Sequence, residues 1–284
     1  MIVGILLAPF LSCFALDWKV LHDKAENISL EQAVTAGNHP GYLEDLYMLA
    51  LVYLGMHKDA EAQGVFEKMK TLDPSSVEAA WGEAELLRRR HELEKSDRYL
   101  QEIISAHPDF VPAYISRAYV KYLRQDFNKS VELASVVLAM GREKVDTGNY
   151  MRAYLILGGG KGMIAHYGGP LSKVINGRGI LAVLKKAESL RPDNAEVLFG
   201  LGSYYLLAPS LVGGNVNKAL DYLERAVKTD PLRADGYVRL AQAYKKKGDR
   251  EKYRDYLQQA LEIDPGSELA LDIKNGTCKF ICVP

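Results

Sequence analysis

A glycine-rich run at 158–162 is the segment of this sequence that most resembles a nucleotide site. The run Gly158-Gly159-Gly160-Lys161-Gly162 follows an apolar stretch, as a phosphate-binding loop follows a strand. That motif requires G-x4-G-K-[ST], in which the Ser or Thr hydroxyl binds magnesium, and Gly162 stands at that position. The residues before the run also fit a helical pattern. We therefore predict a glycine-rich turn between two helices here, and no nucleotide cofactor.

The histidines and carboxylates do not assemble into a catalytic or metal-binding pattern. The six histidines are scattered along the chain: His22, His39, His57, His91, His107 and His166. No two of them stand four residues apart with a third ligand nearby, as a helical zinc site would need. No Ser-His-Asp or Cys-His arrangement can be assembled either. The sequence thus predicts a protein that is not an enzyme and that carries no cofactor, with His166 alone kept as a candidate ligand contact.

The two cysteines near the end of the sequence form a Cys-x3-Cys pair. Cys278 and Cys282 have no histidine near them in the sequence, which argues against a zinc site. In an oxidising compartment the two thiols could instead form a local disulfide.

Composition and charge exclude several kinds of partner. The chain has 284 residues, of which 48% are hydrophobic and 25% charged, a balance typical of a folded protein. Lys plus Arg and Asp plus Glu number 36 each, so the formal net charge is zero. A neutral chain lacks the overall attraction that nucleic acid binding requires, and we predict no nucleic acid partner.

The first sixteen residues carry no charged side chain. This run is too short to span a bilayer, and it fits a secretory signal peptide over residues 1–15 that is cleaved after Ala15. Two alternatives stay open: a retained hydrophobic anchor, or a lipoprotein leader in which Leu11-Ser12-Cys13 ends a lipobox and Cys13 is acylated. The signal peptide and the lipoprotein leader predict an exported protein, either periplasmic or anchored to a membrane through its N-terminus as a lipoprotein, whereas the hydrophobic anchor is the competing interpretation.

Proline spacing determines the fold that the sequence predicts. Pro40, Pro74 and Pro108 are 34 residues apart in turn, and so are Pro231 and Pro265. Proline cannot continue a helix interior, so each one marks the end of a helix. A helix end every 34 residues implies two helices and two turns per unit.

The residues between these prolines resemble the tetratricopeptide repeat (TPR) family, whose pattern is W-x2-L-G-x2-Y, then A-x3-F, then P. The first unit has Leu46, Leu49-Ala50, Tyr53, Ala62, Phe66 and Pro74; the last has Tyr237, Leu240-Ala241, Tyr244, Leu257 and Pro265. The resemblance implies an all-α superhelix of about six helix pairs over residues 43–265. A capping half-repeat at 17–42 would precede it, and a capping helix with a cysteine-containing tail at 266–284 would follow it.

The spacing between successive helix ends is longer than 34 residues in two places. Both lie near glycine-rich stretches, at 158–170 and 206–215. We predict long turns there that form neighbouring protrusions on one edge of the stack. The second segment, from Pro209 through Gly213-Gly214 to Lys218-Ala219, also resembles a pattern in exported bacterial repeat proteins. Among these is the lipoprotein subunit associated with some TRAP transporters.

The resemblance also implies which residues face the concave groove of the superhelix. In this family these are the fifth, ninth and twelfth residues of each first helix. They give Tyr47, Leu51, Leu54, Trp81, Glu85, Arg88, Ile115, Tyr119, Tyr122, Phe199, Ser203, Leu206, Val238, Gln242 and Lys245. The groove is then predicted to be aromatic and apolar in its middle and basic toward the last repeat.

Large aromatic side chains that face a cavity are typical anchors of a binding site. We therefore expect Tyr47, Trp81, Arg88, Tyr119, Tyr122, Phe199 and Lys245 to contact a protein or peptide partner. The alternative is an apolar small molecule, held in the groove in association with a membrane transporter. A structural explanation also stays open, in which these side chains pack against one another or against a segment folded inward.

Overall fold

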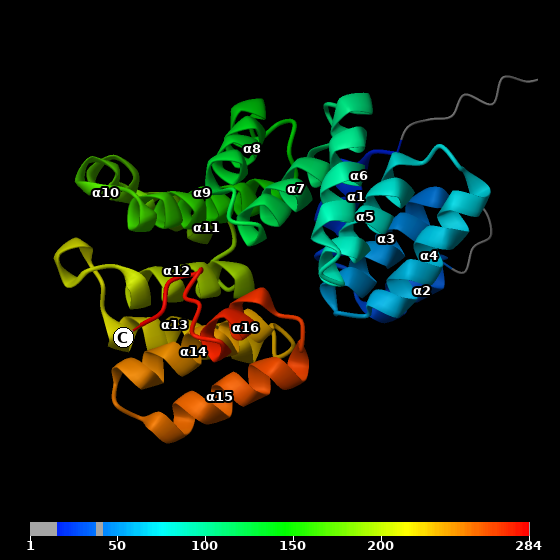
Figure 1. The fold of residues 1–284 in the computed structure, drawn as a ribbon. Helices are drawn as coiled ribbons and strands as arrows, with labels where there is room; N and C mark the ends of the chain where they lie inside the picture. Colours follow the sequence, from blue (N-terminus) through cyan, green and yellow to red (C-terminus); the bar gives the residue numbers. More distant parts are fainter. Residues whose placement is uncertain (1–15, 38–41, 284) are drawn as a thin grey trace, which may run out of the picture.

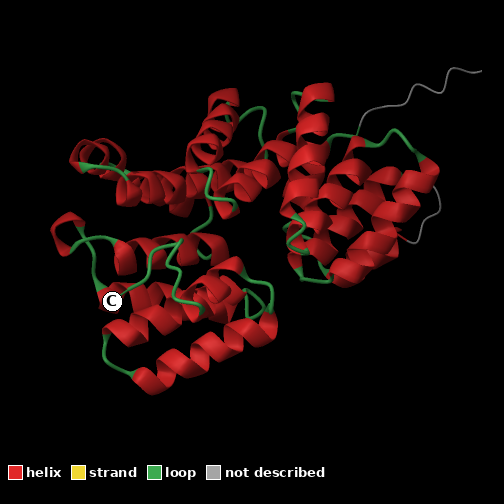
Figure 2. Cartoon of the chain, viewed as in Figure 1, coloured by secondary structure: helices red, strands yellow, loops and turns green. Residues whose placement is uncertain are grey.

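The computed structural model of this chain describes residues 16–37 and 42–283, and all regular structure in them is helical (Figures 1 and 2). Six helix pairs follow one another: α3 (Leu43–Gly55) with α4 (Asp59–Leu72), α5 (Val77–Arg89) with α6 (Leu93–Ala106), α7 (Val111–Leu123) with α8 (Phe127–Met140), α9 (Thr147–Tyr167) with α11 (Ile180–Leu190), α12 (Ala195–Leu207) with α13 (Val216–Thr229), and α14 (Ala234–Lys246) with α15 (Arg250–Ile263). The predicted all-α superhelix of six helix pairs is confirmed.

Shorter helices lie before, between and after these pairs. They are α1 (Trp18–Ala25), α2 (Leu30–Gly37), α10 (Pro170–Gly177), the 3-10 turn η1 (Ser210–Val212) and α16 (Glu268–Lys274). None of the helices in the described part of the chain is long and apolar enough to cross a membrane. The predicted leader at 1–15, including Cys13, lies outside the described residues.

The repeat prolines stand where helices end. Pro74, Pro108, Pro192, Pro231 and Pro265 each follow the last residue of a helix by two positions. A proline ring fixes φ and removes the N–H donor, so the helix cannot continue through it. The next helix of the following unit then starts within a few residues, which keeps the two turns of each unit short.

Small residues let neighbouring helices approach closely, both within a pair and between successive pairs. A Cβ placed on Gly82 of α5 would lie 2.4 Å from the Phe66 ring of α4, and one on Gly202 of α12 would lie 2.6 Å from Leu223 of α13. The side chains of Phe66 and Leu223 are both buried, so these two contacts belong to the hydrophobic core. The repeat pattern thus sets the spacing between helices as well as their length.

The glycine-rich run at 158–162 is not a turn, and this prediction was wrong. All five residues lie inside α9, which continues for 21 residues to Tyr167. A Cβ on Gly158 would lie 2.8 Å from Leu184 of α11, and one on Gly160 would lie 2.6 Å from Val131 of α8. The glycines are needed for close helix packing on two sides. The turn begins only at Gly168, so His166 belongs to the last turn of a helix.

Candidate functional site

A large cavity occupies the centre of the superhelix, and we call it the central cavity. Its volume is about 2140 Å³, and the first helices of all six repeats contribute to its wall. Five of the seven residues predicted to contact a partner line it: Trp81, Arg88, Tyr119, Tyr122 and Phe199. These residues come from α5, α7 and α12, so the predicted concave face does surround a common space.

The other two residues predicted to contact a partner lie elsewhere. Tyr47 is fully buried beneath the cavity wall, and its hydroxyl lies 2.8 Å from His22 Nε2. Lys245 donates to the carbonyl oxygen of Val283, 3.1 Å away. Neither side chain is among those that line the central cavity. Tyr47 is a core residue because α1 covers that part of the concave face, which the repeat pattern alone does not reveal.

The wall on the α5 side is charged rather than purely aromatic. Glu85 accepts hydrogen bonds from Arg88 (Nε to Oε2, 2.9 Å) and from Ser116 (2.8 Å), while Ser116 in turn accepts from Trp81 Nε1 at 3.0 Å. Arg89 also contacts Glu85, at 3.2 Å. The Arg88 guanidinium lies 4.9 Å from the centre of the Tyr119 ring, in cation–π geometry.

The electrostatics of Glu85 follow from these neighbours. Burial on its own acts to raise the pKa of this carboxyl, because the charged form loses solvation. The charge and hydrogen bonds of Arg88, with smaller contributions from Arg89 and Ser116, outweigh that effect and lower the pKa to about 2. Glu85 therefore stays ionised and pairs with Arg88 and Arg89.

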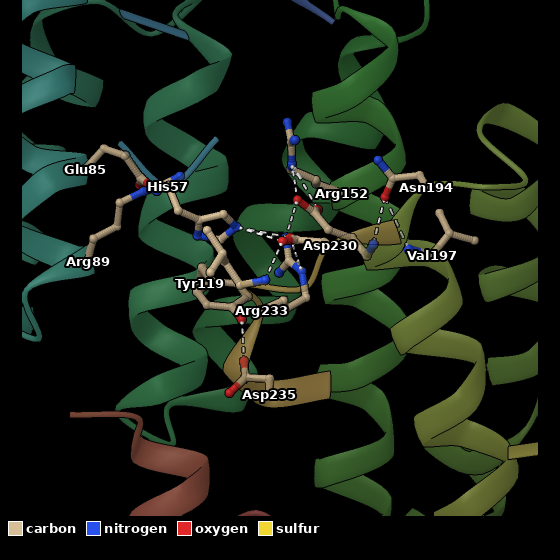
Figure 3. A network of polar contacts seen from close by, with 12 residues as sticks. His57, Glu85, Arg89, Tyr119, Arg152, Asn194, Val197, Asp230, Arg233 and Asp235 are labelled. Atoms are coloured by element: carbon tan, nitrogen blue, oxygen red, sulfur yellow. Dashed lines mark hydrogen bonds and ion pairs between the residues drawn. The ribbon is translucent and has the colours of Figure 1, made fainter. Parts of the chain in front are cut away.

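A second set of charged residues crosses the cavity between elements far apart in the sequence (Figure 3). Glu196 of α12 pairs with Arg152 of α9 (3.0 Å) and with Arg233 (3.4 Å). Arg233 also pairs with Asp230 (3.2 Å), which lies 3.0 Å from His57 Nε2. These contacts thus link the turn after α3, through the turn before α14, to α12 and α9.

A further contact of this kind joins the N-terminal repeats to the last repeat and α16. His91, in the turn after α5, lies 2.9 Å from Glu268 and 3.1 Å from Asp264, which flank the start of α16. Hydrogen bonds from Asp264 and Glu268 raise the pKa of His91 to about 10. His57 and His91 both have positive φ, at 57° and 63°, so the same left-handed turn directs each ring toward the opposite half.

Two groups on the α14 part of the cavity wall, one acidic and one basic, form no ion pair with a described residue. Asp235 and Arg239 lie one turn apart on α14 and both line the cavity. Burial raises the pKa of Asp235, whose nearest hydrogen-bonding groups are the hydroxyls of Tyr119 and Ser267, each at 3.4 Å. Arg239 is buried and, in the described structure, forms no ion pair. Its pKa is lowered by loss of solvation.

The C-terminal tail explains what Arg239 does. Arg239 donates to the carbonyl oxygens of Phe280 (3.0 Å) and Ile281 (3.2 Å), and Gln242 also donates to Ile281 at 3.1 Å. Tyr122 stacks on the Phe280 ring at 5.9 Å. The tail therefore covers the concave face of α14, and the predicted open, basic end of the groove is filled by the chain itself.

Two further contacts hold this tail in place. Asp272 of α16 accepts from the backbone N–H groups of Lys279 (2.7 Å) and Phe280 (2.9 Å). Cys278 and Cys282 form a disulfide that closes the intervening loop. Within the described residues no cluster of three or more His, Cys, Asp or Glu side chains could hold a metal ion.

Part of the charged wall could have been found from the sequence. The second residue of three first helices also lines the cavity: Pro112, Glu196 and Asp235. Positions 2, 5, 9 and 12 are separated by three or four residues and so share one helix face. Counting only positions 5, 9 and 12 missed them. His57, Asp230 and Arg233 lie in or next to turns, where the repeat pattern carries no such signal.

Comparison with known proteins supports the fold and confirms the resemblance to repeat proteins associated with TRAP transporters. The family model described as TRAP transporter T-component matches residues 117–277, more than half of the chain. No curated protein matches the sequence.

Solved structures similar to this one include TPR proteins. The Cut9–Hcn1 hetero-tetramer of the APC/C matches with a TM-score of 0.62 and 13% identity, over 90% of this chain but only 46% of that one. A tetratricopeptide repeat protein from Parabacteroides merdae matches with a TM-score of 0.53 and 14% identity, over 91% of this chain and 97% of that one. At these identities the likeness concerns the fold alone.

Proposed function

The chain belongs to the TRAP transporter T-component family, and on that premise we propose that it is a non-enzymatic component of such a transport system. Its role is to bind a segment of a partner protein in the central cavity. The observation that carries this proposal is the size of the cavity, about 2140 Å³. Small-molecule sites are usually about 300–1,000 Å³, so this cavity has room for a peptide segment or an inserted helix.

The wall offers such a segment two kinds of contact. Tyr119, Tyr122 and Phe199 provide aromatic surface, which suits apolar anchor side chains. The pairs of Glu196 with Arg152 and Arg233 are partly exposed toward the cavity and suit polar main-chain groups. A wall of both kinds fits a polypeptide, which carries apolar side chains on a polar backbone.

A pull-down from the native envelope fraction tests this proposal. We expect Phe199→Ala to weaken capture of the partner about fivefold or more, because aromatic anchors in such sites are typically worth more than about 1 kcal/mol. The matched control is Tyr99→Ala, which removes an exposed aromatic side chain from α6, away from the cavity. Circular dichroism serves as the control that both variants are folded. Equal capture by the wild type and both variants would place binding outside the cavity and overturn the proposal.

A second candidate is an apolar small molecule bound in the same cavity. It is favoured by the tail, which covers the concave face of α14 where an open groove would otherwise continue. Apolar side chains such as Leu155, Ile156 and Leu207 line other parts of the wall. Native mass spectrometry of the purified protein tests this candidate. A co-purifying apolar ligand that Phe199→Ala releases supports it, whereas a mass equal to that of the chain alone contradicts it.

We also propose that the protein acts outside the cytoplasm, with residues 1–15 as its leader. The disulfide between Cys278 and Cys282 supports this location, because disulfides persist in oxidising compartments. Mass spectrometry of the mature N-terminus distinguishes cleavage after Ala15 from acylation of Cys13. Cell fractionation that leaves the protein entirely in the cytoplasm would contradict the proposal.

A further inference from the structure

Exposed apolar side chains are concentrated on the two insertions into the repeat pattern. Thirteen large apolar side chains are exposed in the described residues, and six of them fall in two short segments. These six, which we call the apolar rim, are Tyr167, Leu171, Val174, Ile175, Leu211 and Val212. Leu171 is 72% exposed and Leu211 is fully exposed. Scattered single apolar residues are normal on a protein surface, but a cluster of this kind marks an interaction site.

The two segments lie at the same end of the molecule. Figure 1 shows α10 and the turn that contains η1 one above the other, at the far edge from α2 and α4. Both segments also border the central cavity, through Lys173, Val174 and Arg178 on one side and Pro209 and Val212 on the other. The apolar rim therefore lies at one edge of the cavity, which its residues Val174 and Val212 help to line.

The local sequence places apolar and basic groups together on this rim. Leu171, Val174 and Ile175 are three and four residues apart, so they share one face of α10. Lys173 and Arg178 are exposed beside them, and neither forms an ion pair with a described residue. No Asp or Glu occurs in residues 147–187 or 197–220, although the chain as a whole is neutral.

We propose that the apolar rim docks on the surface of an anionic lipid bilayer, so that this edge of the central cavity faces the membrane. Exposed aliphatic tips flanked by unpaired cations match the interfacial region, where apolar side chains enter the acyl boundary and Lys and Arg stay at the headgroups. A protein interface would instead be expected to carry aromatic anchors or a concave pocket. The rim has projecting aliphatic side chains and only one aromatic residue.

Tryptophan fluorescence in vesicles tests this docking on the full-length chain. Val174→Trp and Leu211→Trp place a probe on each segment of the rim, and Leu72→Trp on α4 is the matched control, since Leu72 is 49% exposed. The vesicles contain brominated phosphatidylcholine with or without phosphatidylglycerol. Wild-type emission gives the background of the two native tryptophans. Because brominated acyl chains quench only on contact, this assay reports which surface enters the bilayer even if the leader already anchors the chain.

We expect emission from Trp at 174 and 211 to fall by about half or more in anionic vesicles, since interfacial side chains lie about 5–10 Å into the headgroup and acyl boundary. Emission from Trp at 72 should not change. Adding Lys173→Gln and Arg178→Gln should return quenching at 174 to its level in neutral vesicles.

Three results would overturn the proposal: equal quenching at positions 72 and 174, no quenching while the chain is bound to vesicles, or a photo-crosslinker at position 174 that captures a protein instead of lipid in cells. The last result would make the rim a protein interface. The docking does not depend on the proposed function of the cavity. Phe199→Ala should leave the quenching unchanged, so the failure of one proposal does not imply the failure of the other.

Discussion

Glu85 allows the electrostatics of the cavity wall to be tested by a single substitution. Glu85→Gln keeps the size of the side chain but removes the charge that neutralises Arg88 and Arg89. The ordinary pKa of the carboxyl is 4.5, and the folded protein lowers it to about 2. That difference corresponds to about 3 kcal/mol of folding free energy at neutral pH. We therefore expect Glu85→Gln to lower the free energy of unfolding by about 2–3 kcal/mol, as measured by urea denaturation at pH 7.

The pH dependence supplies the sign of this effect. Because the folded protein lowers the pKa of Glu85, the stabilisation is complete above pH 4.5 and is lost as the pH falls toward 2. The difference between the wild type and Glu85→Gln should therefore shrink to about half of its neutral-pH value at pH 3. Glu83→Gln is the control on the same helix. Its ion pair with Lys70 is exposed, so this change should cost less than about 1 kcal/mol.

The reasoning about Glu85 would be refuted by equal costs for Glu83→Gln and Glu85→Gln. It would also be refuted by a cost of Glu85→Gln that does not change between pH 7 and pH 3. The first result would mean that burial adds nothing to the pairing of Glu85 with Arg88. The second would mean that the carboxyl is not held ionised by its neighbours.

Three further substitutions test contacts between elements. The pKa of His91 is raised to about 10, so the stabilisation from its ion pairs is complete below pH 6.5 and is lost as the pH rises toward 10. His91→Asn should therefore lower the free energy of unfolding by about 1–2 kcal/mol at pH 6 and by little at pH 10. A cost that does not depend on pH in urea denaturation would contradict this. In α9, Gly160→Ala should destabilise by about 1–3 kcal/mol, because its methyl group would overlap the stiff Val131 side chain. Gly162→Ala should stabilise by up to about 1 kcal/mol, since its nearest neighbour would be 3.9 Å away, and thermal melts in which both variants shift in the same direction would disprove this account of α9.

The repeat pattern predicted the fold because its signal is local and recurs. Pro74, Pro108, Pro192, Pro231 and Pro265 each follow a helix end by two residues, so the same stop signal recurs along the chain. Six copies of the same local interactions leave little choice of architecture. The concave position of Trp81, Arg88, Tyr119, Tyr122 and Phe199 follows from the same periodicity, since all five line the central cavity.

The glycines of α9 show how the same local signal can mislead. A run of Gly158, Gly159 and Gly160 is typical of a turn, because glycine weakens a helix by about 1 kcal/mol per residue. Here two of these glycines allow Leu184 and Val131 to pack against the helix backbone. Those neighbours belong to other helices, so their approach cannot be derived from the run itself.

The sequence by itself therefore determined the helix pairs, their order, their shared concave face and the exclusion of a nucleotide motif. The tertiary structure decided how the superhelix closes on itself. It joins His57 to Asp230 and His91 to Asp264, each pair 173 residues apart, and it lays the tail across α14 against Arg239. The rotation between successive repeats accumulates along the whole chain before such residues can meet. A local sequence pattern does not specify this accumulated rotation. Only the tertiary structure therefore shows the charged wall of the cavity, the end that the tail fills and the apolar rim at its edge.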